Sequence, residues 1–360
     1  MSTSPFTDAS PQNSESSISV IIPVYNRPRM AVEAVQSVLF QSHTRLECIL
    51  VDDGSTEPPE EACRLFGADP RFRYLRTEHT GMPGAARNRG VAASRFDLIA
   101  FLDSDDLWFP RKLEFQLGLM KGSLEPGGEK GPALIHSREV WLRGDRTISQ
   151  KTQRHRRRGN VFRDALVKCM IGPSTVLMDR KVYRDLGGFR EDLEVAEDYE
   201  FWLRLTARYD VEYIDVPLVV KRAGHGEQLS EKYGQIEIFR LRVLYDLLRS
   251  GWFFEIDSLR TAQKIRRSGR GSTGLTEPDS SPAWESFRDS RDPDWPAAQN
   301  LSSPEVPEDP GGPSLHEIAA AELVRKAGIY AAGCRKRGRD DEALMYERMA
   351  GEFLSSRGLS

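Results

Sequence analysis

The sequence predicts an α/β fold in which a mixed, mainly parallel sheet is flanked by helices, followed by a small C-terminal α-hairpin. Short β-branched runs alternate with helical patterns over residues 18–102, which is typical of parallel strands joined by crossover helices. Acidic groups follow two of the apolar runs, at residues 52–53 and 103–106. In such sheets, ligands bind beyond the carboxyl ends of the strands.

The composition sets limits on the function. The 360 residues carry a formal net charge of −3, so no overall field attracts the chain to nucleic acid. The four cysteines form no Cys-x-x-Cys pair, which argues against a zinc knuckle and fits a reduced compartment. No stretch approaches the roughly 20 apolar residues of a membrane span, and residues 1–17 lack a signal-peptide core. We expect a cytoplasmic protein without a transmembrane segment, with peripheral contact at the inner face of the membrane left open.

The first elements follow from hydrophobic periodicity. Residues 18–24 form a β-branched run that ends in turn chemistry at residues 25–28, and residues 46–51 return to strand character. Between them, residues 30–41 carry apolar side chains at helical spacing, so the unit predicts two parallel strands with a right-handed crossover. The alternation continues with a helix over 60–66, a strand over 72–75, a helix over 84–93 and a strand over 98–102.

The pattern beyond residue 110 is less regular. A helix is predicted over 111–120, a strand over 133–142 and a helix over 199–209. The basic run at residues 154–158 is interpreted as a solvated loop or as a contact for an anionic acceptor or lipid headgroup.

The C-terminal part differs in composition. Residues 267–313 are dense in Ser, Pro, Gly and Asp, which predicts a disordered linker. A chain ending near Arg266 is expected to keep its chemistry if it stays soluble. Ser314 then starts a helix with Glu317 at capping-box spacing, and a second helix is predicted over 341–353. This hairpin resembles one tetratricopeptide unit, and we expect it to pack on the core or to mediate self-association.

The acidic run after the strand at 98–102 predicts a cation site. The alternation of Asp103, Ser104 and Asp105 predicts an extended segment with both carboxylates on one side. Carboxylate oxygens suit Mg²⁺ or Mn²⁺. Asp106 either adds to this cluster or caps the following segment.

Five motifs in a fixed order carry a family resemblance. They lie at residues 19–26, 51–55, 84–90, 101–106 and 197–204. Together they resemble the inverting family 2 glycosyltransferases of GT-A fold, over roughly residues 18–230. The resemblance implies metal-dependent transfer of a sugar from a nucleotide-sugar donor, most often a UDP-sugar, to a hydroxyl on a glycan or lipid-linked acceptor, in polysaccharide or glycoconjugate synthesis.

The resemblance also implies roles in nucleotide binding. Asp53 would accept a hydrogen bond from the donor base with the support of Asp52, and Pro23 and Tyr25 would line that base. The neighbouring residues Arg87 and Asn88 would face the nucleotide, with an exposed helix face as the alternative.

The remaining implied roles concern metal and catalysis. Asp105 would bind Mn²⁺ or Mg²⁺ directly, while Asp103 would bind the metal or the ribose hydroxyls. His225 would complete the metal site or contact the diphosphate, unless it is an ordinary loop histidine. Asp198 would be the catalytic base that removes the proton of the acceptor hydroxyl, although a carboxylate at a helix start also serves as a cap.

Two other functions stay open. A sugar-phosphate nucleotidyltransferase shares the acidic strand edge, but its Gly-x-Gly-x-Arg loop is missing where residues 23–27 stand. A catalytically inactive GT-A-like binding module would keep the fold alone. The predicted division of the chain is a disordered tail over 1–17, a GT-A domain over 18–262, a disordered linker over 263–313 and the helical hairpin over 314–357.

Overall fold

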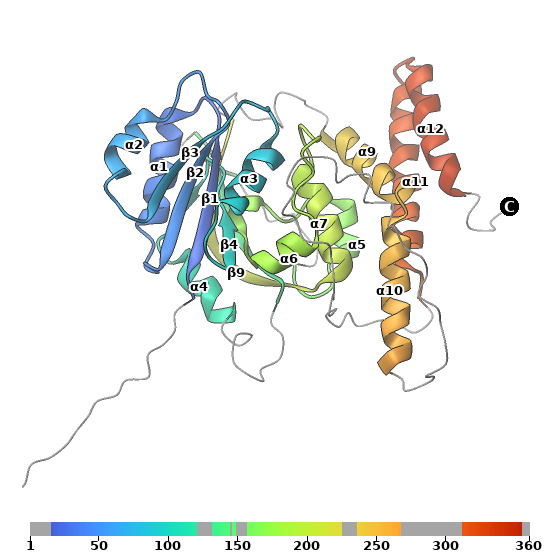
Figure 1. Cartoon of the computed structure of the whole chain (residues 1–360). Helices are drawn as coiled ribbons and strands as arrows, with labels where there is room; N and C mark the ends of the chain where they lie inside the picture. The colour runs from blue at the N-terminus through green and yellow to red at the C-terminus, as the bar shows by residue number, and fades with distance from the viewer. Residues whose placement is uncertain are drawn as a thin grey trace, which may run out of the picture.

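The computed structural model describes residues 16–120, 132–144, 146–148, 157–224, 236–267 and 312–354 (Figure 1). Most of the predicted N-terminal tail, most of the predicted linker and His225 lie outside the described residues.

The N-terminal half of the sheet is parallel, as the alternating pattern predicts. Its strands lie in the order β3-β2-β1-β4, and Ile21 of β1 pairs with Ile49 of β2 and Phe101 of β4. The strands are β1 (Ile18–Val24), β2 (Leu46–Asp52), β3 (Phe72–Arg76) and β4 (Leu98–Phe101), and the connecting helices are α1 (Pro28–Leu39), α2 (Glu60–Phe66) and α3 (Pro83–Ala92).

The second half of the sheet mixes strand directions. Strand β8 (Leu177–Asp179) runs antiparallel to both β4 and β6 (Leu134–Arg143), while β9 (Val211–Ala223) runs parallel to β6. The edge strands β5 (Leu107–Trp108) and β7 (Arg146–Ile148) pair antiparallel with β9 and β6. The predicted α/β fold with a mixed sheet is confirmed. The helices of this half are α4 (Lys112–Met120), α5 (Phe162–Val167), α6 (Arg180–Asp185) and α7 (Glu197–Arg208).

Both faces of the sheet are covered by apolar packing. One face of β1 contributes Ile18, Val20 and Ile22 to a core shared with α1 and α4. The opposite face contributes Ile21 to a second core, shared with α3, α6 and α7. Helix α3 approaches this face so closely that a Cβ at Gly90 would lie 2.3 Å from the Cγ2 of Ile21, so only glycine fits there.

The C-terminal helices form a third apolar cluster together with two helices of the α/β domain. Helices α9 (Ile236–Arg249), α10 (Trp252–Arg267), α11 (Leu315–Arg335) and α12 (Asp340–Leu354) share this cluster with α5 and α7. Figure 1 shows α11 and α12 side by side next to α9 and α10. The predicted capping box at Ser314 and Glu317 is confirmed. The hairpin therefore packs on the core.

Candidate active site

The acidic run after β4 forms a tight turn. The Asp106 amide donates to the Asp103 carbonyl at 2.9 Å, so the expected extended segment was wrong. Such a bond closes a β-turn, which bends the chain. The turn nevertheless gathers carboxylates, because ligand atoms of Asp103, Asp105 and Asp106 all lie within 4.8 Å of one another.

The three carboxylates of this acidic turn each pair with a basic side chain from a different part of the chain. Arg27 of the β1–α1 loop pairs with Asp105 at 2.8 Å, and Arg87 of α3 pairs with Asp103 at 2.7 Å. Lys221 of β9 lies 3.3 Å from Asp106. The charge of the acidic turn is thus balanced by cations that only the tertiary fold brings together.

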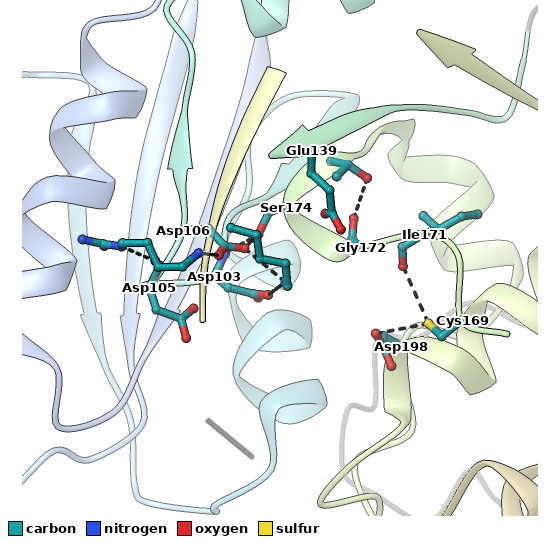
Figure 2. A network of polar contacts seen from close by, with 12 residues as sticks. Asp103, Asp105, Asp106, Glu139, Cys169, Ile171, Gly172, Ser174 and Asp198 are labelled. Carbon is teal, nitrogen blue, oxygen red and sulfur yellow. Dashed lines mark hydrogen bonds and ion pairs between the residues drawn. The ribbon is translucent and has the colours of Figure 1, made fainter. Parts of the chain in front are cut away.

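Asp106 is the buried member of the turn. Its carboxylate accepts from the Ser174 hydroxyl at 2.6 Å, and the same hydroxyl accepts from the Asp103 amide at 3.1 Å (Figure 2). Asp106 also accepts from the Arg222 amide at 3.3 Å. It therefore links the acidic turn to β9 and does not cap α4. Burial raises the pKa of Asp106 to about 7; the neighbouring carboxylates add to this rise, and Lys221 opposes it.

The Asp52 and Asp53 pair ends β2 on the same edge of the sheet. Asp52 is fully buried and accepts from the Ser55 amide at 2.9 Å and the Tyr74 hydroxyl at 2.6 Å. Asp53 accepts from the Gly81 amide at 2.9 Å. Asp52 therefore stabilises the strand end, while Asp53 holds the loop that leads into α3.

An aromatic surface lies beside Asp53. The ring of Tyr25, which is 41% exposed, stacks on the His79 ring with 4.1 Å between centroids. Pro23 is half-buried near the end of β1. These groups form an aromatic and apolar wall at the end of β1 and β2.

Arg87 is buried between two carboxylates. Besides Asp103 it donates to Glu197 at 2.6 Å, at the start of α7. Asn88 instead faces the segment before α7, because its amide nitrogen donates to the Phe189 carbonyl at 2.9 Å and to Glu191 at 2.7 Å. These bonds engage Asn88 within the chain, and the expectation that it faces the nucleotide stays a prediction.

Asp198 lies in the first turn of α7. This helix begins after Ala196, whose φ of 65° is in the left-handed region, and no side chain caps it. Asp198 is half-buried and accepts from the Cys169 thiol at 3.5 Å. Figure 2 shows Asp198 and the acidic turn on separate elements, with Gly172 and Ser174 between them.

Two further predictions concern the basic run at residues 154–158, as a solvated loop or an anion contact, and His225, as a metal or diphosphate ligand. Arg157, from the basic run, donates to the Tyr213 hydroxyl at 2.7 Å and is thus bound to β9. His225 stays a prediction. No sequence pattern indicated the roles of Ser174 and Lys221, because each meets the acidic turn across a long separation along the chain.

Comparison with known proteins gives the family of the chain. Residues 19–187 match the model of glycosyl transferase family 2. A Bacillus subtilis protein named "Putative teichuronic acid biosynthesis glycosyltransferase TuaG" is 31% identical over 189 residues, which are 52% of this chain and 71% of that protein. The chain belongs to glycosyltransferase family 2. An uncharacterized glycosyltransferase of Rickettsia felis is 32% identical over 59% of this chain, but the chain spans only 34% of that relative's length.

Solved structures of similar fold come from Staphylococcus aureus TarS. TarS 1-349 in complex with UDP-GlcNAc has a TM-score of 0.54 and 15% identity, covering 96% of this chain and 93% of that chain. At this identity the likeness concerns the fold, which is the GT-A arrangement.

For this family 2 chain, none of the helices in the described ranges has an apolar stretch long enough to cross a bilayer.

Proposed function

We propose that this chain is a metal-dependent inverting glycosyltransferase that moves a sugar from a UDP-sugar donor to a hydroxyl of a glycan or lipid-linked acceptor. The observation that carries the proposal is the convergence of Asp103, Asp105 and Asp106 at the carboxyl edge of the sheet, beside the end of β2. Two comparisons support the donor class. The Escherichia coli relative WfgD, 27% identical over 76% of its length, is named as a UDP-Glc glucosyltransferase, and the TarS structure contains UDP-GlcNAc.

The acidic turn fits a hard divalent cation. Its ligand atoms are carboxylate oxygens within 4.8 Å of one another, the donor type that Mg²⁺ and Mn²⁺ prefer. Burial is the main cause of the raised pKa of Asp106. Because Arg27, Arg87 and Lys221 already pair with the three carboxylates, a bound cation would share or replace these partners. Asp105 and Asp103 would hold the metal, with His225 as a further predicted ligand. A bound metal supplies charge stabilisation for the leaving diphosphate.

Other residues of the site would hold the nucleotide. Asp53 lies at the end of β2 and would accept from the donor base in addition to the bonds that its carboxylate accepts from Thr80 and Gly81. The Tyr25 ring and Pro23 offer a surface against which that base packs, and Asp52 keeps the strand end in place through Tyr74. Arg87, through its ion pair with Asp103, orients the acidic turn toward the diphosphate.

Asp198 would act as the base. In the proposed reaction its carboxylate takes the proton of the acceptor hydroxyl, while the hydroxyl oxygen bonds to the anomeric carbon and the bond to the UDP oxygen breaks on the opposite side. Attack opposite the leaving group inverts the anomeric configuration. Arg87 connects this base to the donor side, because it bonds to both Glu197 and Asp103.

The test combines nucleotide binding and turnover. Calorimetry with UDP and Mn²⁺ is expected to show binding that EDTA removes, and a panel including UDP-glucose and UDP-GlcNAc is expected to show UDP release. Asp105→Ala should abolish both signals, whereas Asp97→Asn should change neither, because the Asp97 side chain is 95% exposed. Normal activity in EDTA would overturn the metal requirement, and a folded protein that releases UDP from no donor would favour the inactive binding module.

A further inference from the structure

A buried lysine of the C-terminal hairpin contacts the ring of Tyr199, the residue that directly follows Asp198. Lys326 of α11 is only 4% exposed, and its ammonium nitrogen lies 5.6 Å from the centre of the Tyr199 ring. Arg240 of α9 approaches the same ring at 5.8 Å. Glu237 pairs with both cations, at 3.4 Å from Lys326 and in direct contact with Arg240. We call Lys326, Glu237, Arg240 and Tyr199 the tyrosine clamp.

The Tyr199 ring is fixed at its far end as well. It is 1% exposed, and its hydroxyl donates to the Leu166 carbonyl of α5 at 2.7 Å. A cation near the face of an aromatic ring is attracted to it, and more strongly when water is excluded. The ring is therefore held by three elements besides its own helix: α5, α9 and α11.

Packing alone does not explain a lysine at this position. The inward side chains of α11 are otherwise mostly small and apolar, as at Ala319, Leu323, Ala327 and Ala331. Taking an ammonium out of water is costly, and burial lowers the pKa of Lys326 while Glu237 opposes that shift. An apolar residue would fill the same space at less cost, so the charge of Lys326 indicates a role in orientation.

We propose that the tyrosine clamp positions the catalytic base, so that Lys326 of the C-terminal hairpin is a positioning residue for Asp198. The proposal rests on the proposed function, in which Asp198 is the base. Tyr199 directly follows Asp198 in the first turn of α7, so holding the ring fixes the rotation of that turn. A displacement of about 1 Å at a reacting group can lower a rate by about 10²-fold.

The first experiment compares Lys326→Met with Arg325→Met. Met keeps the length of the side chain and removes its charge. Arg325 is a control from the same helix because its own side chain is half exposed, although its partner Glu322 is only 11% exposed. UDP release from UDP-glucose and UDP-GlcNAc gives kcat and KM, and calorimetry gives the Kd for UDP with Mn²⁺. We expect Lys326→Met to lower kcat by about 10-fold or more, with KM and Kd unchanged. Lys326→Arg keeps the cation and should restore kcat.

The second experiment repeats the change in an Asp198→Asn background. If Lys326 acts through Asp198, Lys326→Met should lower kcat no further there, since interacting residues are not additive. An equal further loss, or a Lys326→Met kcat equal to that of Arg325→Met, would overturn the proposal. Normal kcat in Asp198→Asn would overturn the base assignment and the clamp's role with it. Glu237→Gln provides a second variant with the same expectation if Lys326→Met does not fold.

Discussion

The Nη1 of Arg87 donates to Oε1 of Glu197 at 2.6 Å, although the two residues are 110 positions apart in the sequence. Through its other terminal nitrogen Arg87 donates to Asp103 at 2.7 Å. One buried side chain thus connects the acidic turn after β4 to the first turn of α7, which carries Asp198. The proposed metal site and the proposed base are held in fixed relation by this ion-pair network.

Arg87→Met should destabilise the protein strongly. The change leaves the carboxylates of Asp103 and Glu197 without this partner, and breaking a buried ion pair costs about 3 to 5 kcal/mol. Urea unfolding followed by circular dichroism measures the free energy. Arg89→Met on the same helix is the control; it pairs with Asp53 at 3.5 Å and is 35% exposed, so its loss should stay below about 1 kcal/mol. Equal losses in the two variants would contradict a structural role of the Arg87 network.

Asp198→Asn should separate turnover from nucleotide binding. Removing a general base lowers a rate by about 10² to 10⁴-fold. Asp198 lies on α7, apart from the acidic turn, so the Kd for UDP with Mn²⁺ should not change. Calorimetry and UDP release are the two measurements. Loss of UDP binding in the folded variant would show that the donor and base functions are not divided between these elements.

Ser174→Ala should weaken the acidic turn. The Ser174 hydroxyl bonds to the buried carboxyl group of Asp106, and such a bond is worth about 0.5 to 1.5 kcal/mol when that group is neutral and about 1.5 to 3 kcal/mol when it is ionised. We expect Ser174→Ala to lower the free energy of unfolding by this amount and to raise the Kd for Mn²⁺ in the presence of UDP. Ser94→Ala is the control, because its buried hydroxyl donates to the Val91 carbonyl at 2.6 Å and accepts from Arg180 at 3.5 Å, and bonds to none of the three carboxylates of the acidic turn. An unchanged Kd for Mn²⁺ in Ser174→Ala would contradict the proposed metal site.

Truncation after Arg267 should make the chain aggregate, so it should not meet the condition of solubility under which the composition predicts that the chemistry is kept. The cut removes α11 and α12 and uncovers apolar side chains of α9 and α10, among them Leu244 and Phe253. Exposed apolar surface of this kind promotes aggregation. Size-exclusion chromatography and thermal melting provide the measurement. A chain ending after Leu354 is the control, since it keeps both helices. A soluble, active truncation at Arg267 would restore the view that the hairpin is dispensable.

Glu47→Gln should lower stability in a pH-dependent way. Glu47 is fully buried and accepts from the Ser19 hydroxyl and the Arg95 amide, each at 2.7 Å. Burial raises its pKa, but the hydrogen bonds from Ser19, Arg95 and Arg73 outweigh this and hold the pKa below the usual 4.5. A lowered pKa stabilises the fold above pH 4.5, and this contribution is lost as the pH falls through the folded-state pKa.

We therefore expect Glu47→Gln to cost about 2 kcal/mol at pH 7. The difference from the unaltered chain should shrink below pH 4.5, which thermal melting across a pH series measures. A difference that stays constant down to pH 3 would show that the carboxylate charge contributes nothing.

The local chemistry of the sequence was enough to predict much of the fold. The alternation over residues 18–102 depends on side-chain periodicity within each element, and the strands and helices it predicts are present with shifts of one or two residues. The capping box at Ser314 is likewise a contact between near neighbours. Acidic residues at the ends of β2 and β4 could be expected at one edge, because parallel neighbours of β1 end on the same side.

Only the tertiary structure decided which groups meet these carboxylates. Lys221 reaches Asp106 across 115 positions and Ser174 across 68, and Lys326 reaches Glu237 across 89. No periodicity or motif spacing encodes such pairs, because they depend on how strands and helices of the two halves pack together. The sequence by itself thus determined the elements and the acidic strand ends, whereas the counter-charges around them and the clamp behind Asp198 arise from packing between distant segments.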